Sequence, residues 1–254
     1  LRASIAATGS RPLKATLSDA IQSAVADKVP GISWVKERPE LMILFDTLTL
    51  GVNVDIRALF LYGRYRKLER GIPQTRWPCR ACRGRDGGCE SCNFTGQQYP
   101  DSIQSLVCEP LVEHTEAKTD AFHGMGREDI DVRCIGNGRP FVAELKSPLR
   151  RTLDLDNLTK EINKAAKDKI EITGLRVSNR AEVARIKETK AEKSYTIRFT
   201  CEHGFDEDEI ITRIQSLSGQ VLEQQTPQRV AHRRADKIRK RKVISIDNIL
   251  VEEN

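Results

Sequence analysis

The chain has 254 residues, of which 39% are hydrophobic and 31% are charged, a composition typical of a globular protein with one large or two small domains. The net charge of +6 favours a polyanionic partner. No apolar run approaches the roughly 20 residues that span a bilayer, and the first residues of this sequence show no secretory pattern, so we expect a soluble cytoplasmic protein and no membrane protein.

The first elements along the chain are a helix and two strands. Apolar residues recur at helical spacing over 13–29, and Pro30 with Gly31 is expected to end that helix. The apolar run 41–45 predicts a buried strand, and 52–60 predicts another after a glycine. Residues 61–100 then read as a long basic insertion, which needs its own source of stability.

Cysteine spacing within this insertion predicts a metal site. Two Cys-x-x-Cys pairs are separated by six residues that include three glycines: Cys79, Cys82, Cys89 and Cys92. Each pair can present two thiolates to one metal, and the glycines permit tight turns beneath them. We expect a structural zinc in a zinc-knuckle insertion over 76–98, with two disulfides or an iron–sulfur cluster as the alternatives. Cys108, Cys134 and Cys201 read as ordinary thiols.

A short helix over 102–113, capped by Ser102, precedes the most informative run of the sequence. In this run Asp129 and Asp131 lie two residues apart, with Arg127 and Arg133 on either side, and a glycine-rich segment follows. In a strand, the two carboxylates would share one face. In a loop, one of them could instead be held as a fixed nucleophile or base, kept ionised by the neighbouring guanidiniums.

The elements after this run complete an α+β pattern. We predict strands at 139–146, 194–201 and 243–251, and helices at 158–170 and 206–217, the last with Asp206 as its cap. The fold class expected is therefore α+β, with a mixed, mostly antiparallel sheet flanked by helices.

Positive charge is concentrated in two stretches. Residues 57–85 contain nine Lys and Arg against one acid, and residues 229–242 contain eight against one acid. Such runs create local electropositive surfaces that attract phosphate backbones, although a solvated charged face is the plainer interpretation. Both runs are rich in arginine, which suits bidentate phosphate contacts.

The run from Gly126 to Phe141 resembles the catalytic signature of the Pus ten family of tRNA pseudouridine synthases, Gly-Arg-Glu-Asp-x-Asp-x-Arg-x-x-Gly-x-Gly-Arg-Pro-Phe. Every fixed position of that signature is present. Residues 61–68 and 70–75 are similar to the family's segment before the catalytic region, and Thr226 to Arg234 is similar to its later basic loop.

The resemblance implies the pseudouridine synthase catalytic fold and the isomerisation of uridine 54 and/or 55 in the T arm of tRNA. It implies no organic cofactor and no obligate protein partner. Asp129 matches the catalytic aspartate, whereas Asp131 is expected to be structural. Tyr195, otherwise interpreted as a core tyrosine, matches the tyrosine that contacts the uracil ring. The residues expected to bind RNA are Tyr62, Arg66, Arg127, Arg133, Arg139, Arg233 and Arg234.

The resemblance also suggests how the chain is divided. Residues 1–48 would be the remnant of an N-terminal RNA-binding domain that contains a THUMP motif, and 49–254 an incomplete catalytic domain lacking a later Ala-Gly-Thr-Tyr-Ile-Lys-Glu segment. Because the chain opens at Leu1, we expect a fragment. Two other functions remain open: a zinc-containing RNA-binding module without catalysis, and a metal-dependent nuclease using Asp129, Asp131 and Glu144, with Lys146 in a Glu-x-Lys pattern.

Overall fold

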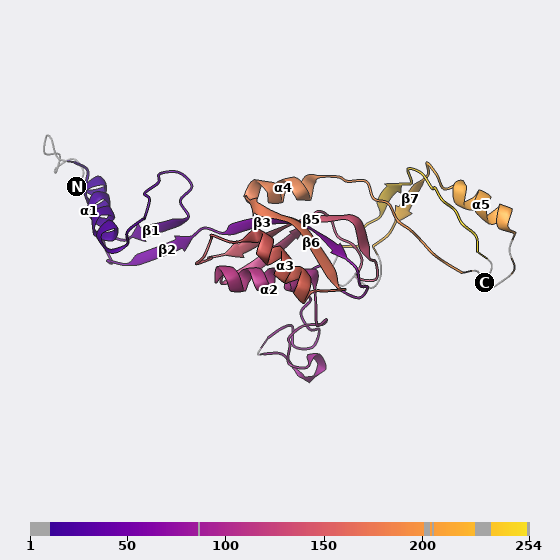
Figure 1. Ribbon diagram of the computed structural model, residues 1–254, viewed down its shortest axis with the longest axis horizontal. Helices are drawn as coiled ribbons and strands as arrows, with labels where there is room; N and C mark the ends of the chain where they lie inside the picture. The colour runs from indigo at the N-terminus through magenta and orange to yellow at the C-terminus, as the bar shows by residue number, and fades with distance from the viewer. Residues whose placement is uncertain (1–10, 86, 201–203, 205, 227–234, 253–254) are drawn as a thin grey trace. The chain divides into compact units, whose positions relative to one another are not determined.

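The computed structural model describes residues 11–85, 87–200, 204, 206–226 and 235–252 (Figure 1). The chain forms two compact units, Leu1–Ala191 and Glu192–Asn254. No helix among the described residues is long and apolar enough to cross a membrane.

A four-stranded antiparallel sheet is the centre of the first unit. Its strands lie in the order β4 (Thr119–Gly124), β5 (Cys134–Lys146), β3 (Leu59–Lys67) and β6 (Ile170–Ser178). All three neighbouring pairs are antiparallel. The predicted α+β class with antiparallel strands flanked by helices is confirmed.

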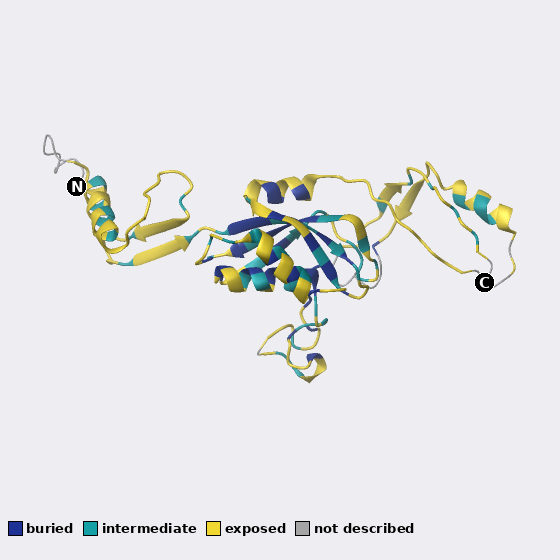
Figure 2. Ribbon diagram, viewed as in Figure 1, coloured by how far each residue is buried: buried dark blue, intermediate teal, exposed yellow. Residues whose placement is uncertain are grey.

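Helices cover both faces of this sheet (Figure 1). Helices α2 (Ile103–Thr115) and α3 (Leu155–Ala165) pack on one face, where Leu61 and Phe141 belong to the larger hydrophobic cluster. Helix α4 (Arg180–Glu188) packs on the other face, over Phe60 and Val142. The buried residues in Figure 2 are accordingly concentrated in the sheet and on the inner sides of these helices.

Local sequence explains where two of the helices begin. The Ser102 hydroxyl accepts a hydrogen bond from the Ser105 amide, so the predicted cap of α2 is confirmed. The Asp154 carboxylate accepts from the Asn157 amide, so α3 begins before Leu158, earlier than predicted. Helix α3 also ends earlier than predicted, at Ala165. A right-handed helix cannot continue through Asp168, which has a φ of 67°, and Ile170 already opens β6.

The prediction for residues 52–67 was wrong in part. The predicted single strand is divided into β2 (Val52–Ile56) and β3, and residues 61–67, which were assigned to the basic insertion, form the centre of the sheet. Residues 61–67 were misassigned because two polar residues of β3, Tyr65 and Lys67, were read as exposed. Both are buried, and they lie on the same face of the strand as Leu61.

The N-terminal elements form where they were predicted, but without a core. Helix α1 spans Leu13–Lys28, and β1 (Leu41–Phe45) pairs with β2 in an antiparallel hairpin. Burial of β1 was predicted wrongly, since four of its five residues are exposed. A two-stranded hairpin has no second layer of its own to cover an apolar face. The proposed boundary near residue 48 stays a prediction.

The second unit contains α5 (Glu207–Gln215), capped by Asp206 as predicted, and a hairpin of β7 (Val221–Gln224) with β8 (Arg239–Lys242). The predicted strands are absent from the described residues 194–200 and 243–251, and Cys201 lies outside the described residues. Alternating apolar residues can form a strand only where a neighbouring strand supplies hydrogen bonds, and no described strand pairs with either segment.

Candidate functional site

The signature aspartates lie in a loop, which settles one of the alternatives that the sequence left open. Residues 125–133 connect β4 to β5, and neither Asp129 nor Asp131 belongs to a strand. Asp129 is half-buried, whereas Arg127, Asp131 and Arg133 are exposed. A loop carboxylate keeps a fixed position only if its backbone is held, and contacts from β3 and β5 provide that restraint.

The first restraint is a buried polar network around Glu128, whose side chain is 5% exposed. The Tyr65 hydroxyl lies 2.8 and 2.7 Å from the two Glu128 carboxylate oxygens. The Gln74 amide donates to the Tyr65 hydroxyl at 2.9 Å and to the Gly126 carbonyl at 3.1 Å. Burial, and after it the Glu128 charge, raises the pKa of Tyr65 well above its usual value. The hydroxyl therefore stays protonated and donates a hydrogen bond to Glu128.

Arg139 joins this network from β5. Its Nε lies 2.8 Å from a Glu128 oxygen as an ion pair, and its Nη1 donates to the Met125 carbonyl at 2.7 Å. The guanidinium was expected to bind substrate, and here it holds both ends of the segment 125–128. A role in RNA binding stays a prediction. Gly138, with a φ of 68°, allows this close packing because a Cβ there would lie 2.7 Å from the Tyr65 carbonyl oxygen.

The second restraint is Lys67, which is fully buried at the end of β3. Its Nζ donates to the carbonyls of Ile72 at 3.1 Å, Asp129 at 2.9 Å and Ile130 at 3.0 Å. The Gly71 amide also donates to the Ile130 carbonyl at 2.8 Å. Sequence reasoning missed Lys67 because the lysine was counted as surface charge. The signal that could have found it is its place on the apolar face of an alternating strand.

Two residues predicted to bind RNA, Tyr62 and Arg66, lie on the opposite face of β3 from Tyr65 and Lys67. The Arg176 guanidinium carbon lies 4.2 Å from the centroid of the Tyr62 ring. Arg66 forms an ion pair with Glu171. Both predicted residues therefore have partners within the sheet, and their contact with RNA stays a prediction.

Glu182 fastens α4 to this face. Arg176 binds it through both terminal nitrogens, at 2.9 and 2.7 Å, and Ser178 and Arg185 donate to it as well. The hydrogen bonds from Arg176, against the opposing effect of burial, lower the pKa of Glu182 from 4.5 to about 2. Glu182 is therefore ionised near neutral pH and holds two arginines at the helix.

The first basic stretch is used largely inside the protein. Five of its nine basic residues contact protein groups: Arg64, Arg66, Lys67, Arg70 and Arg76. Arg57, Arg80, Arg83 and Arg85 are exposed. The electropositive surface predicted from this stretch is thus smaller than its charge count indicates, because a charge count cannot distinguish internal ion pairs from surface charge.

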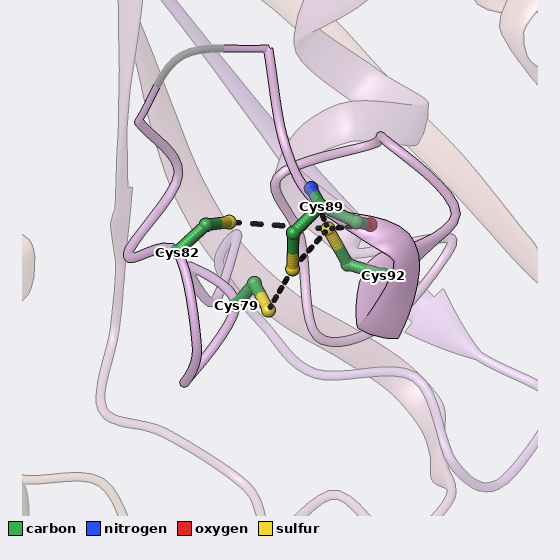
Figure 3. Close-up of side chains that lie close together, drawn as sticks. All are labelled: Cys79, Cys82, Cys89 and Cys92. Carbon is green, nitrogen blue, oxygen red and sulfur yellow. Dashed lines mark hydrogen bonds between the residues drawn. The ribbon is translucent and has the colours of Figure 1, made fainter.

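The four predicted cysteines come together in one cluster, in which the sulfur atoms all lie within 4.8 Å of one another (Figure 3). Three of the separations are 3.9, 3.9 and 3.8 Å. A tetrahedral zinc with bonds of about 2.3 Å requires sulfur–sulfur separations of about 3.8 Å. The cluster therefore fits a metal held by four thiolates, and iron–sulfur or disulfide chemistry is not needed to explain the spacing.

Backbone amides favour the ionised form of one of these thiols. The amides of Cys89 and Gly96 lie 3.2 and 3.3 Å from the Cys92 sulfur. The hydrogen bond from the Cys89 amide has the largest effect on the pKa of Cys92, and the Gly96 amide adds to it. Although burial opposes them, together they lower the pKa of this thiol to about 6. A thiol with this pKa is mostly ionised at neutral pH, in the form that ligates metals.

The base of the cysteine loop is closed by backbone contacts. Pro78 and Gln97 form a β-bridge, the Cys79 amide donates to the Gly96 carbonyl at 2.8 Å, and the Gln98 amide donates to the Trp77 carbonyl at 2.8 Å. The predicted role of the glycines is confirmed, since Gly84, Gly87 and Gly88 have φ values of 75°, 74° and 96°. The excursion is thus a separate module with a narrow stem, and its four cysteines are close enough to hold a metal.

Three predicted site residues belong to the second unit. Tyr195 is 68% exposed and lies outside any strand, so its predicted place on an apolar strand face was wrong. Its assignment as a catalytic residue stays a prediction. Arg233 and Arg234 lie outside the described residues.

The nuclease alternative has no support in the geometry. Among the described residues, the cysteine cluster is the only group of three or more His, Cys, Asp or Glu side chains close enough to hold a metal. Glu144, which a nuclease site would need beside Asp129, instead lies 2.8 Å from the His123 ring nitrogen.

Comparison with known proteins identifies one family, both by its family model and by individual relatives. The family described as "Pus10, C-terminal" matches residues 60–254. The protein named "tRNA pseudouridine synthase Pus10" from Methanocaldococcus jannaschii is 42% identical over 228 residues, 90% of this chain and 48% of that protein. The protein of the same name from Methanothermobacter marburgensis is 47% identical over 203 residues, 79% of this chain and 50% of that protein. The chain spans about half the length of the curated relatives that it matches.

Proposed function

The chain belongs to the Pus10 family, and from that premise we propose that it is a tRNA pseudouridine synthase, an isomerase that acts on uridine within tRNA. The observation that carries the proposal is the complete signature run 126–141, whose loop is restrained on both sides of Asp129. A module that only bound RNA would not need the backbone around Asp129 to be fixed in this way.

The proposed reaction rearranges one nucleotide and consumes nothing else. The bond between N1 and C1′ breaks, the uracil turns, and C5 bonds to C1′; C5 then loses its proton and N1 gains one. Atoms and electrons balance without an oxidant, so no organic cofactor is required. A stacked base cannot react in this way, so the target uridine must first be flipped out of the RNA.

Asp129 is the proposed catalytic residue. An ionised carboxylate at this position can attack C1′ or the base, or remove the proton from C2′, and each of these steps requires its negative charge. Arg127 and Arg133 flank it on the exposed side of the loop and are proposed to pair with the phosphate of the flipped nucleotide. Asp131 is proposed to be structural.

The proposed substrate is the T arm of tRNA, at uridine 54 and/or 55. Tyr195 is proposed to contact the uracil ring, and Tyr62 and Arg66 the RNA backbone or bases. The basic stretch around Arg233, Arg234 and β8 is proposed to add phosphate contacts. All of these assignments rest on the family resemblance, and those of the arginines rest also on their charge.

The metal is proposed to be a structural zinc held by Cys79, Cys82, Cys89 and Cys92. Four thiolates complete a tetrahedral shell, so no position is left for water or substrate. Zinc would supply stability to an excursion with little core of its own, and no catalytic step passes through it.

The substitution Asp129→Asn tests the proposed function. The amide keeps the size of the side chain but loses its charge, so we expect pseudouridine formation in a T-arm RNA to be abolished and RNA affinity to stay within a few-fold. The assay is mass spectrometry of the RNA after incubation. It uses this chain and, in parallel, the chain joined to the segments that flank the matching region in the Methanothermobacter marburgensis relative.

Asp131→Asn is the matched control, and it should reduce activity less. Full activity in Asp129→Asn would overturn the assignment, and activity lost only in Asp131→Asn would transfer the role to the second carboxylate. RNA binding without turnover by both unsubstituted proteins would favour the RNA-binding module instead.

A further inference from the structure

The buried ammonium of Lys67 has no role in the reaction proposed above. A lysine ammonium has three donors, and here three backbone carbonyls accept from it, at 2.9 to 3.1 Å. A neutral amine has only two donors, so this set of acceptors fits the charged form. Burial of an ammonium is costly unless its donors are satisfied, and here they all are.

The acceptors of Lys67 lie in the signature loop and in the segment that follows β3. Two of them are the carbonyls of Asp129 itself and of the next residue, Ile130. The Gly71 amide shares the Ile130 carbonyl, and Arg70 donates to the carbonyl of Asp131. Three consecutive carbonyls of the loop are therefore held by groups from residues 67–71. Rotation of the peptide between Asp129 and Ile130 would break bonds to a buried charge.

We propose that Lys67 is the positioning residue that holds the backbone of Asp129 in the geometry its carboxylate needs for reaction, an inference that rests on the proposed function. All three donors of Lys67 are bound to the backbone, so it does not act on the substrate. It acts through the loop, whose displacement by even about 1 Å is enough to cost about 100-fold in rate.

A merely structural lysine would have a different effect from a positioning lysine. Loss of a purely structural contact lowers the fraction of folded enzyme, and thus the amplitude of a single-turnover reaction. Loss of positioning lowers the rate constant of the molecules that are folded. RNA affinity should not change in either case, because Lys67 is buried.

The test is Lys67→Met, which keeps an unbranched apolar stem as far as the Cε position and removes the ammonium. We expect the single-turnover rate constant on T-arm RNA to fall about 100-fold, with the dissociation constant for RNA unchanged. Lys169→Met is the matched control, because Lys169 bonds a side chain outside the loop, Asp101. Its rate constant should stay at the value of the unsubstituted protein.

Hydrogen–deuterium exchange supplies a second readout that needs no activity. Amides of residues 126–133 should exchange faster in Lys67→Met, while those of β3 and β5 keep their protection. If neither this chain nor the chain joined to the relative's flanking segments forms pseudouridine, the proposed function fails, and exchange still decides whether Lys67 holds the loop. An unchanged rate constant, or unchanged exchange in the loop, would overturn the inference.

Lys67→Arg serves if the methionine variant does not fold. It keeps the charge, but a planar guanidinium cannot direct donors at three carbonyls arranged around an ammonium. We expect a rate constant about tenfold lower, on the scale of a small loop displacement. A rate constant equal to that of the unsubstituted protein would overturn the inference here as well.

Discussion

Replacing Tyr65 with phenylalanine removes one hydroxyl from the buried network around Glu128 and leaves the ring in place. The ring centroid lies 5.9 Å from that of Phe122 and 6.2 Å from that of Phe141, and both contacts survive the substitution. The hydroxyl is shared between the two oxygens of Glu128, so one charge-assisted hydrogen bond is lost, together with the hydrogen bond that the hydroxyl accepts from the Gln74 amide. Such a bond contributes about 1.5–3 kcal/mol.

The loss should not be larger, because the partners keep other contacts. Glu128 retains its ion pair with Arg139, and Gln74 retains the Gly126 carbonyl. We therefore expect the free energy of unfolding to fall by about 2 kcal/mol. For a protein of this size, that corresponds to a decrease of about 4–8 °C in Tm.

Urea and thermal unfolding followed by circular dichroism measure this change. Tyr99→Phe is the matched control, because the Tyr99 ring packs edge-on against Trp77 and its hydroxyl has no recorded hydrogen bond among the described residues. Glu128→Gln, alone and combined with Tyr65→Phe, gives the coupling energy of the pair. A loss below about 0.5 kcal/mol for Tyr65→Phe would refute the reasoning, since that is the range of an ordinary surface substitution.

Three further predictions concern the metal, the pH dependence and the salt dependence. Purified protein should contain one zinc per chain by metal analysis, and Cys79→Ser should lose it, because three thiolates leave the tetrahedral shell open. The pKa of Glu182 is lowered from 4.5 to about 2 in the folded state, so its stabilising effect is present above about pH 4.5 and is lost as the pH falls towards 2. In Glu182→Gln, the free energy of unfolding should therefore change less between pH 4.5 and 2. Neutralising the four basic residues of β8 should weaken binding to tRNA and reduce the salt slope by roughly one unit per lost phosphate contact.

Each of these has a result that would contradict it. Zinc content unchanged in Cys79→Ser would place the metal elsewhere. Parallel curves of unfolding free energy against pH for the unsubstituted protein and Glu182→Gln between pH 4.5 and 2 would show that the ion pair of Glu182 with Arg176 does not stabilise the fold. An unchanged salt slope would make β8 a solvated face without RNA contact.

Elements whose signals are local were predictable from the sequence. The cap of α2 and the cap of α5 each depend on residues three positions apart, and both were found. The cysteine cluster depends on residues within a single excursion, so spacing alone identified its four members. In these cases the residues that contact one another are close in the sequence, so their spacing alone reveals the contact.

Elements that depend on distant partners were not predictable in the same way. Lys67 is buried because carbonyls more than 60 residues along the chain accept from it, and no local pattern contains them. Glu128 was interpreted only as part of a signature, whereas its role depends on Tyr65 and Arg139. The segment 194–200 has the alternation of a strand, but no described strand pairs with it, and it does not form a strand.

The closed stem of the cysteine loop has a consequence for how this protein can be rebuilt. Pro78 and Gln97 lie side by side, so a tight turn could join them and the chain would re-enter at the point where it left. The excursion can therefore be deleted or grafted onto another hairpin as a cassette. Its length is then free to vary without altering the register of any strand in the central sheet.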